Sequence, residues 1–305
     1  MKLSDYFRLF LLAAIWGGSF LFMRIVAPVL GALPTAFFRV LLSSLGLVVI
    51  LAALRQSWDF KNKFGAALAL GVINSGVPFL MYGLAASLLP AGYSAIFNAT
   101  TPLMGVVIGA LFFGETISAR KGLGVAAGLA GVVLLTAVGP MAFSASILLG
   151  ALACLVATAC YGMAGFLTKR WITERGGLDP KLVAFGSQLG ACLILMPFFG
   201  VSAAFTPPAS WGGNTVWLAL AALGLICTAW AYIIYFRLIA DIGPLRSLTV
   251  TFLIPPFGVL WGVLFLGEQI SWAHLGGGSL IALALWLVLG QGAQQAAAPG
   301  RTAAR

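Results

Sequence analysis

The residues best suited to chemistry in this chain are a few polar side chains set inside long apolar stretches. Arg39 lies about 9 Å along the helix expected over 33–54, and Gln188 lies inside the stretch 180–200. An arginine in hydrocarbon surroundings is costly and normally marks a polar interior or a functional site. Three interpretations of Arg39 stay open: it binds a substrate carboxylate, it makes a structural bond between helices, or it snorkels to lipid headgroups.

A second set of polar residues lies near the middle of two proline-containing stretches. Asn98 precedes Pro102 by four residues, and Thr251 precedes Pro255 by the same spacing. Proline donates no backbone hydrogen bond and clashes with the carbonyl four residues back, so we expect both carbonyls to lack the usual helical hydrogen bond. Free acceptors at this depth need protein or a wet cavity around them. We therefore expect Asn98 and Thr251 to line a cavity, with Pro102 and Pro255 as hinges. The alternative is a close-packed seam, which the glycines of both stretches favour.

Aromatic side chains with a polar edge occupy matched positions in several stretches. Such residues either line a pocket or anchor a helix at the membrane surface. Trp16 and Tyr161 lie deep enough to favour the pocket, and Tyr82 and Trp230 lie in two further equivalent stretches. The predicted substrate site therefore contains Trp16, Arg39, Tyr82, Asn98, Tyr161, Gln188, Trp230 and Thr251.

The titratable residues exclude most enzymatic and metal chemistry. His274 is the single histidine, and the four cysteines lie inside apolar stretches without a CxxC pair. The sequence holds no HExxH, no Gly-x-Ser-x-Gly and no paired carboxylates within a stretch. We therefore predict no metal, no cofactor and no catalytic residue. The alternatives to a metabolite carrier are a membrane-embedded enzyme and a multidrug or cation efflux carrier.

The elements that position these residues must be membrane-spanning helices. The chain is 61% hydrophobic and 8% charged, and its mean hydropathy is +1.07. Apolar stretches of roughly 20 residues, the length that crosses a bilayer, recur throughout, and lipid allows such segments to be helices only. The sequence predicts an all-α integral membrane protein with ten transmembrane helices at about 8–27, 33–54, 64–88, 90–113, 119–138, 147–168, 180–200, 214–240, 243–266 and 272–290.

The net charge of +10 follows the topology of these helices. Of the 17 basic residues, 15 fall in alternate links or in the terminal segments, and only Arg24 and Arg39 do not. Positive charge of this distribution marks the cytoplasmic side. We predict a multi-pass protein of the cell inner membrane with both termini in the cytoplasm, and we expect no nucleic-acid partner.

The chain contains an internal duplication. The segment 111–118 (LFFGETIS) returns as 264–271 (LFLGEQIS) with six of eight residues identical, and further matches continue at the same offset of 153 residues. Each half then has five spans, so the two halves have opposite orientation. We predict two inverted five-helix repeats over 8–138 and 147–290, followed by a disordered tail over 291–305.

The duplication also predicts two gates. Arg24 and Glu268 are expected at the outer ends of their helices, and Lys169 and Glu115 occupy the equivalent positions at the cytoplasmic side. We predict one basic–acidic pair on each side, formed when that side is closed. The alternative is that each glutamate only solvates the turn in which it lies.

The motifs in both halves resemble the EamA-type members of the drug/metabolite transporter superfamily. The resemblance covers about 8–290 and rests on the segment 16–20 (WGGSF), on Pro34 with Phe38-Arg39, and on Pro102 followed by Gly114-Glu115. It implies export or exchange of small metabolites, often amino acids or related compounds, through a central cavity by alternating access, in a monomer or homodimer. Phe185 lies near the position that matches Arg39, so no symmetric arginine pair is expected. None of the seven acidic residues lies deep in a span, which predicts facilitation or exchange without ion coupling.

Overall fold

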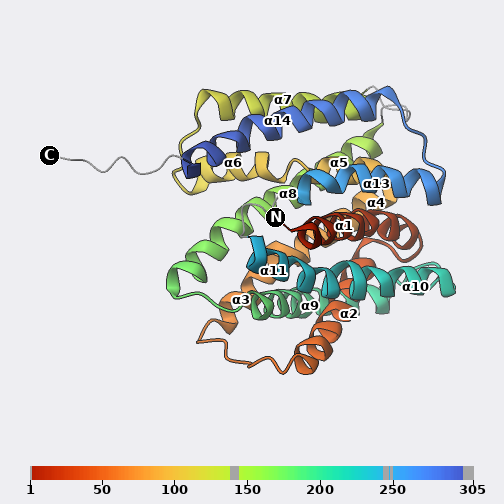
Figure 1. The fold of residues 1–305 in the computed structure, drawn as a ribbon. Coiled ribbons are helices and arrows are strands. Elements are labelled where there is room, and N and C mark those ends of the chain that lie inside the picture. The colour runs from red at the N-terminus through yellow and green to blue at the C-terminus, as the bar shows by residue number, and fades with distance from the viewer. Residues whose placement is uncertain (1, 138–143, 243–246, 248–249, 298–305) are drawn as a thin grey trace.

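The computed structural model of the protein describes residues 2–137, 144–242, 247 and 250–297. The described residues form helices joined by short links, without a strand. Their order along the chain, which can be followed in Figure 1, is α1 Leu3–Leu30, α2 Ala32–Ala53, α3 Phe64–Gly71, η1 Val72–Gly76, α4 Val77–Leu88, α5 Ala91–Asn98, α6 Thr101–Phe112, α7 Ala119–Ala137, α8 Ala145–Trp171, η2 Thr173–Arg175, α9 Pro180–Phe205, α10 Asn214–Ala221, η3 Ala222–Trp230, α11 Ala231–Ile242, α13 Val250–Leu266 and α14 Trp272–Ala297.

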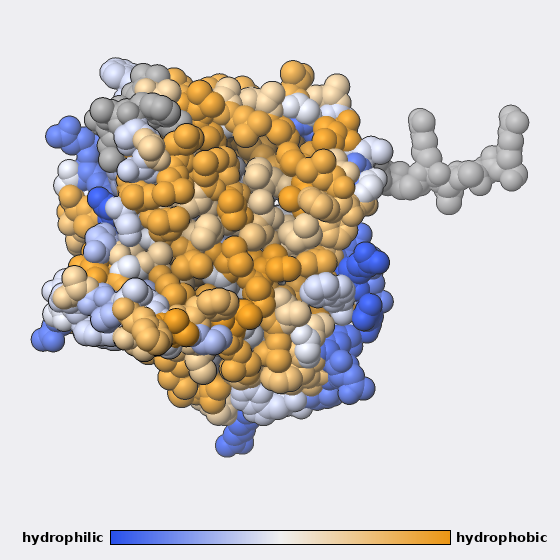
Figure 2. Space-filling view, turned by 180° about the vertical axis from the view of Figure 1, so that it is seen from behind, coloured by the Kyte–Doolittle hydropathy of each residue, from blue (hydrophilic) through white to orange (hydrophobic). Residues whose placement is uncertain are grey.

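Many of these helices are apolar and long enough to cross a membrane. Six pass by length and composition within the described chain, and the bent pair α5 and α6 makes a seventh. The segments Val250–Leu266 and Trp272–Val288 are shorter apolar helices. Figure 2 shows a broad apolar surface with hydrophilic residues gathered mainly along one edge. The all-helical fold is as predicted, whereas the full count of ten inverted spans stays a prediction.

Helices from the two halves cross at paired glycines. A Cβ added at Gly17 of α1 would lie 2.9 Å from the backbone nitrogen of Gly258 in α13. A Cβ at Gly162 of α8 would lie 2.9 Å from the backbone nitrogen of Gly105 in α6. Without side chains at these crossings, the backbones can approach closely. The glycines of the two proline-containing stretches therefore lie at packing seams, as their alternative interpretation predicted.

Two helices contain a π-helical segment at equivalent positions. The segment η1 lies between α3 and α4, and η3 lies between α10 and α11. Moving Val72–Gly76 by the repeat offset of 153 residues places it inside Ala222–Trp230. A π-turn changes which residues share a face of the helix and is frequently found at functional sites. The sequence analysis did not predict these segments.

The two predicted hinges lie in different backbone settings. Pro102 is in the first turn of α6, directly after the break that bends α5 against α6 by 44°. Pro255 and Pro256 lie inside α13, which continues through both. Proline is well tolerated in a first helical turn because those N–H groups have no intrahelical partner. Pro255 therefore weakens its helix more than Pro102 weakens α6.

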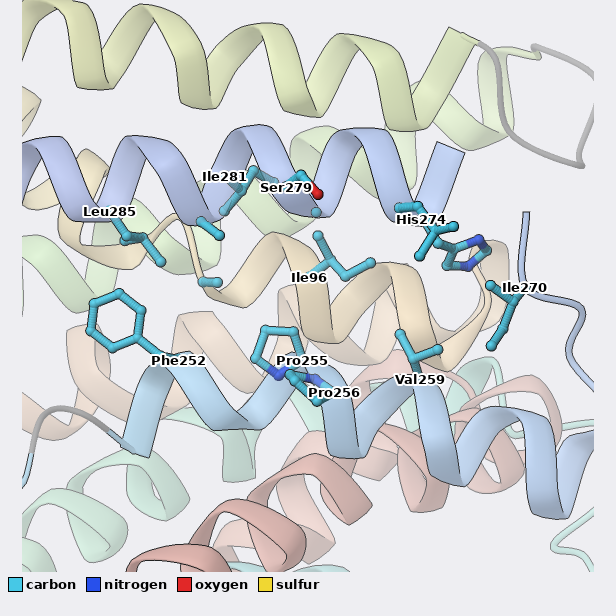
Figure 3. A pocket seen from close by; sticks show the side chains of 14 residues that line it. Ile96, Phe252, Pro255, Pro256, Val259, Ile270, His274, Ser279, Ile281 and Leu285 are labelled. Atoms are coloured by element: carbon cyan, nitrogen blue, oxygen red, sulfur yellow. The ribbon is translucent and has the colours of Figure 1, made fainter. Parts of the chain in front are cut away.

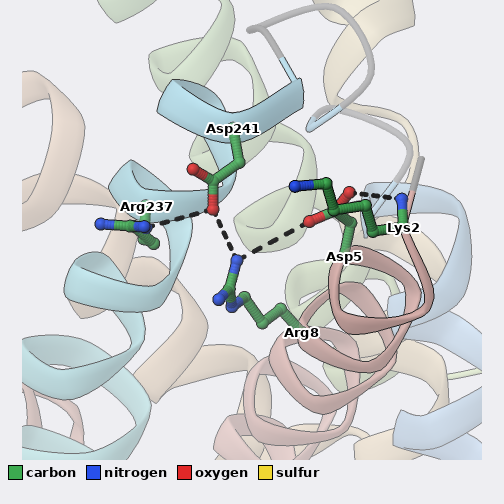
Figure 4. A network of polar contacts seen from close by, with 5 residues as sticks. All are labelled: Lys2, Asp5, Arg8, Arg237 and Asp241. Atoms are coloured by element: carbon green, nitrogen blue, oxygen red, sulfur yellow. Dashed lines mark hydrogen bonds and ion pairs between the residues drawn. The ribbon is translucent and has the colours of Figure 1, made fainter.

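An ion network joins the start of α1 to the end of α11 (Figure 4). The Arg8 guanidinium lies 2.5 Å from the Asp241 carboxylate and 3.7 Å from the Asp5 carboxylate. Arg237 donates to the same Asp241 oxygen at 3.1 Å, and the backbone N–H of Lys2 donates to Asp5 at 2.7 Å. This network links the two halves at the end where basic residues are concentrated.

The C-terminal segment begins differently from the prediction. A disordered tail was expected from residue 291, but α14 continues to Ala297. Residues 291–297 are mostly alanine and glutamine, which are good helix formers, so the helix extends past the apolar stretch. Residues 298–305 lie outside the described residues.

Candidate functional site

Arg39 lies at the centre of a polar cluster between the two halves. Its side chain is only 6% exposed. Its Nε donates to the Thr228 hydroxyl of η3 at 3.1 Å, and its Nη1 contacts the Met23 sulfur of α1 at 3.4 Å. The guanidinium carbon lies 3.6 Å from the centre of the Phe79 ring in α4, a favourable cation–π geometry. Side chains from three other helical segments, α1, α4 and η3, therefore contact this one cation from α2.

The charge of Arg39 has no carboxylate partner within the described chain, where the ion pairs involve other residues. Burying an unpaired charge is costly unless another group compensates it. Its burial removes the interpretation of Arg39 as a snorkelling residue, because the guanidinium is enclosed by side chains. The carboxylate-binding and interhelical interpretations stand, and the bond to Thr228 is an interhelical one.

Tyrosine side chains and an asparagine extend this cluster. The Tyr82 hydroxyl donates to the Asn98 side-chain oxygen at 3.0 Å. The rings of Tyr82 and Tyr161 stack with centres 6.2 Å apart, and both tyrosines interact electrostatically with Arg39. The structure thus brings together four of the predicted site residues: Arg39, Tyr82, Asn98 and Tyr161. These residues could bind a carboxylate beside an aromatic and amide surface.

Thr228 is a member of this cluster that sequence reasoning missed. Its hydroxyl accepts from Arg39 and donates to the Leu223 carbonyl, five residues back, at 2.8 Å. That carbonyl belongs to the π-helical segment η3, where the bonding pattern is shifted. One threonine in a long apolar stretch resembles a packing residue, and only its equivalence to Ser75 at the repeat offset could have singled it out.

The equivalent position in the other half holds a neutral polar cluster. A Cβ at Gly224 would meet the Arg39 carbonyl, and a Cβ at its repeat partner Gly71 would meet the Ser187 carbonyl. Ser187 of α9 therefore takes the place that Arg39 takes in α2. Correspondingly, the Ser187 and Ser75 hydroxyls lie 3.4 Å apart. Phe185, near which the match to Arg39 was expected, packs instead against Trp58.

Gln188 belongs to this neutral cluster and not to the cluster around Arg39. Its side-chain nitrogen donates to the Ser75 hydroxyl at 2.7 Å. Within the described residues its side-chain oxygen has no partner, although Gln188 is fully buried. Asn74 donates to Ser187 at 3.4 Å, and the Tyr232 hydroxyl is within hydrogen-bonding reach of Ser75 and Asn74. Since Tyr232 also interacts with the Arg39 charge, it connects the two clusters.

The remaining predicted site residues lie apart from Arg39. Trp16 packs against Tyr235 with ring centres 5.3 Å apart. Thr251 is partly exposed in the first turn of α13. Trp230 is 51% exposed, on the outer surface of its helix, so the structure does not support its assignment to the cavity. The stretch 214–240 also contains Thr228, Tyr232 and Tyr235, but its π-helical segment η3 changes which residues share a face.

The predicted gate pairs are not formed. Arg24 donates to the Ala86 carbonyl at 2.7 Å, and Glu268 accepts from the backbone N–H groups of Ala91 and Gly92 at 2.6 and 3.1 Å. Each side chain is thus satisfied by a helix end instead of by the other.

At the opposite end of the bundle, the second predicted pair is also absent. Lys169 lies 3.9 Å from Glu174, and both side chains are more than half exposed. Glu115 is likewise exposed. Lys169 lies in the last turn of α8 and Glu115 in the link after α6, and water can satisfy both charges there.

A cavity of about 380 Å³ lies between α13 and α14 against α5 (Figure 3). Its walls are almost entirely apolar, with His274 and Ser279 as polar contributors. Pro255 and Pro256 form part of one wall. The cavity does not include Arg39, so it is not the polar site. It leaves the face of α13 that carries Pro255 and Pro256 without close packing.

Comparison with known proteins agrees with this architecture. Residues 4–137 and 148–290 each match the EamA-like transporter family. The chain is 24% identical over 278 residues to the uncharacterized transporter YoaV of Bacillus subtilis, covering 90% of this chain and 92% of that protein. It is 25% identical to protein PecM of Dickeya dadantii, covering 94% and 92%. A probable terminal-alkyne amino-acid exporter of Streptantibioticus cattleyicolor is 26% identical, covering 70% of each chain.

A solved crystal structure of a protein has the same fold. Its TM-score is 0.65 at 19% identity, and the match covers 98% of this chain and all of the other. At this identity the match concerns the arrangement of helices alone.

Proposed function

We propose, from the premise that the chain belongs to the EamA-like transporter family, that it exports or exchanges small carboxylate-bearing metabolites. The most suitable substrates are amino acids and related compounds. One of the relatives is named as a probable amino-acid exporter, which supports this substrate class. The chain is a multi-pass membrane protein, and we place it in the plasma membrane, as expected of a bacterial transporter.

The observation that carries the proposal is the buried guanidinium of Arg39. A cation that is 6% exposed and has no carboxylate partner among the described residues is suited to receive a carboxylate from outside the protein. Arginine and carboxylate form strong, often bidentate hydrogen bonds. The same charge opposes a cation efflux carrier, because a cationic substrate would be repelled from the cluster.

The transport cycle that we propose is alternating access between two inverted halves of five spans each, over 8–138 and 147–290. The paired crossings of α1 on α13 and α8 on α6 support it, as do the equivalent π-helical segments. The charge distribution supports a cytoplasmic location of both termini. The Arg39 cluster lies between the halves and would be reached from each side in turn.

The energy source that we propose is the substrate gradient itself. The acidic residues lie in the terminal segment, in links or at span ends, so no span offers a deep carboxylate to carry a proton or sodium ion. The lack of such a carboxylate therefore favours facilitation or exchange over ion-coupled transport. A protonophore should leave exchange at zero membrane potential unchanged.

The test is counterflow in liposomes that contain the purified protein. Vesicles loaded with an unlabelled amino acid should accumulate the labelled one without chemical change, whereas the corresponding decarboxylated amine should not be exchanged. Arg39→Gln should reduce exchange by roughly 100-fold or more, because leaving a buried charged group without its partner costs about 3–5 kcal/mol.

The matched control is Arg120→Gln. Arg120 lies at the start of α7, and its guanidinium stacks on the ring of Trp286. This variant should exchange at the wild-type rate. Equal exchange of the amine and the amino acid, or full activity of Arg39→Gln, would contradict the proposal. Appearance of a new chemical product would instead support an enzyme.

A further inference from the structure

The turn between α4 and α5 is held by two opposite charges from other helices. Arg24 of α1 donates to the carbonyl of Ala86, in the last turn of α4, at 2.7 Å. Glu268, just after α13, accepts from the first N–H groups of α5, those of Ala91 and Gly92, at 2.6 and 3.1 Å. The cation lies at the C-terminal end of one helix and the anion at the N-terminal end of the next. Both placements are electrostatically favourable.

The turn that follows α13 places the Glu268 carboxylate at the start of α5. Gly267 has a φ of +67°, a left-handed conformation that glycine adopts without strain and that commonly ends a helix. The backbone N–H of Glu268 then bonds to the Gly262 carbonyl at 3.1 Å. A Cβ at Gly262 would overlap the Glu268 carboxylate, so only glycine leaves room for the side chain to fold back across α13.

The same turn occurs in the first half, but its carboxylate is not engaged in the same way. Gly114 has a φ of +68°, and the backbone N–H of Glu115 bonds to the Gly109 carbonyl at 3.0 Å. The backbone device is therefore duplicated. Glu115 is exposed, however, whereas Glu268 is partly buried against α5. The two ends of the bundle thus differ in whether the acidic side chain joins the halves.

We propose that Arg24 and Glu268 are positioning residues that close the outer end of the transport pathway by clamping the α4–α5 turn. This inference builds on the proposed transport cycle and its orientation. Glu268 comes from the second half and its partners from the first, so the clamp ties the halves together at this end. Opening to the outside requires the two N–H groups of α5 to lose the carboxylate. The structure is therefore the outward-closed state.

Cys154 offers a native reporter below the clamp. It is fully buried in α8, and its sulfur lies 4.0 Å from the hydroxyl of Ser94, which follows Gly92 in α5. The other three cysteines are Cys160, Cys192 and Cys227. In a background where these are alanine and transport is retained, a membrane-impermeant maleimide added outside right-side-out vesicles reports the opening of this end.

The clamp variants should expose Cys154 to the outside reagent. We expect Glu268→Ala and Gly262→Ala to raise the labelling rate about tenfold, which corresponds to about 1.4 kcal/mol and is the scale of a lost N-terminal cap. Arg24→Ala should act in the same direction. Glu115→Ala and Gly278→Ala, the latter a glycine with open space around it, should label like the parent.

Two results would overturn the clamp. One is unchanged labelling in both Glu268→Ala and Gly262→Ala, and the other is labelling that rises only when the reagent is inside. Because labelling needs no substrate, its result tests the clamp whether or not Arg39 binds a carboxylate.

A charge exchange separates this clamp from a direct ion pair. If Arg24 and Glu268 paired with each other, the double variant Arg24→Glu with Glu268→Arg would recover the closed state. In the clamp, Arg24 is placed at the C-terminal end of α4 and Glu268 at the N-terminal end of α5. The exchange places a negative charge at the former and a positive charge at the latter, and both are unfavourable. The double variant should therefore label at least as fast as Arg24→Glu or Glu268→Arg alone, and recovery to the parental rate would overturn the proposal.

Discussion

The two π-helical segments use one backbone device with different chemistry. In η3, the Thr228 hydroxyl accepts a hydrogen bond from the buried guanidinium of Arg39 in α2. In η1, the equivalent Ser75 meets the Ser187 hydroxyl and the Gln188 amide from α9. The paired positions, the glycine contacts and the helix partners correspond. Charge is what differs, because one cluster contains an arginine and the other contains neutral side chains only.

This difference indicates how a duplicated fold becomes asymmetric in function. A symmetric arginine pair would place two buried cations near one another, which costs repulsion as well as two desolvation penalties. One cation facing a neutral cluster avoids the second cost. It also leaves the two clusters with different charge, one cationic and one neutral, and Tyr232 lies near both of them.

The strongest test of this comparison removes the equivalent hydroxyls one at a time. Thr228→Val deletes the acceptor of Arg39 Nε, whereas Ser75→Ala deletes the acceptor of Gln188. A hydrogen bond to a charged group contributes about 1.5–3 kcal/mol and a neutral one about 0.5–1.5 kcal/mol. We expect Thr228→Val to weaken amino-acid exchange roughly 10- to 100-fold and Ser75→Ala about 2- to 10-fold.

Concentration-dependent counterflow measures both variants, with the yield of folded protein as a control. The comparison breaks down if the two substitutions are equally harmful. It would be reversed if Ser75→Ala were the more harmful, since the neutral cluster would then dominate binding.

The second test uses the two prolines, which are equivalent in sequence but not in setting. Pro255→Ala restores a hydrogen bond to the Thr251 carbonyl inside the continuous helix α13, beside a cavity that leaves it room to bend. Pro102→Ala changes a first-turn position next to an existing break. One helical hydrogen bond contributes about 0.5–1.5 kcal/mol.

We therefore expect Pro255→Ala to slow saturated exchange about 2- to 10-fold with little change in apparent affinity. Pro102→Ala should remain within about twofold of the wild type. Rapid-sampling counterflow at saturating substrate gives these rates. A larger effect at Pro102 would show that the bend between α5 and α6, and not α13, limits the cycle.

Sequence reasoning reached the helices and part of the site for physical reasons. Apolar length predicts spans, and an arginine surrounded by apolar residues must be compensated, so Arg39 could be singled out in advance. The bond between Tyr82 and Asn98 was not predicted, but both residues had been assigned to one site. Asn98 was selected for its place four residues before Pro102, and Tyr82 as an aromatic residue with a polar edge in an equivalent stretch.

The partners of the charged residues could not be predicted because they are backbone groups or unremarkable side chains. Arg24 and Glu268 were expected to bind each other. The backbone groups at a helix end are equally good partners, but no particular residue type identifies them in a sequence. Trp230 was assigned to the cavity but is 51% exposed, because the π-helical segment η3 changes which residues of this stretch share the buried face. The π-segments shift the register without any distinctive residue, so periodicity does not reveal them.

The smallest expected effect concerns how the equivalent helices α2 and α9 begin. Helix α2 starts after Gly31 without a side-chain cap, whereas Asp179 caps α9 by accepting from the Lys181 backbone N–H at 2.9 Å and pairs with its ammonium at 2.9 Å. Partial burial raises the pKa of Asp179, but the hydrogen bonds and charge of Lys181 outweigh it, so the pKa is lowered overall. The stabilisation is therefore complete above the unfolded pKa of about 3.9 and is lost as the pH falls through the lower folded value.

Asp179→Ala should cost about 1 kcal/mol, the usual contribution of a cap, and should lower the apparent Tm in detergent by roughly 2–4 °C. Asp179→Asn should cost less, because asparagine retains the cap and loses only the partly exposed ion pair with Lys181. Fluorescence-detected thermal unfolding at pH 7 measures both, and a third measurement near pH 3 should bring the wild type toward the variants. Exchange kinetics should not change in either variant, because this cap lies outside the clusters around Arg39 and Gln188 that we propose as the substrate site. A loss of exchange in Asp179→Asn without a loss of Tm would mean that the start of α9 moves during the cycle, and that the asymmetry between the halves extends to their helix ends.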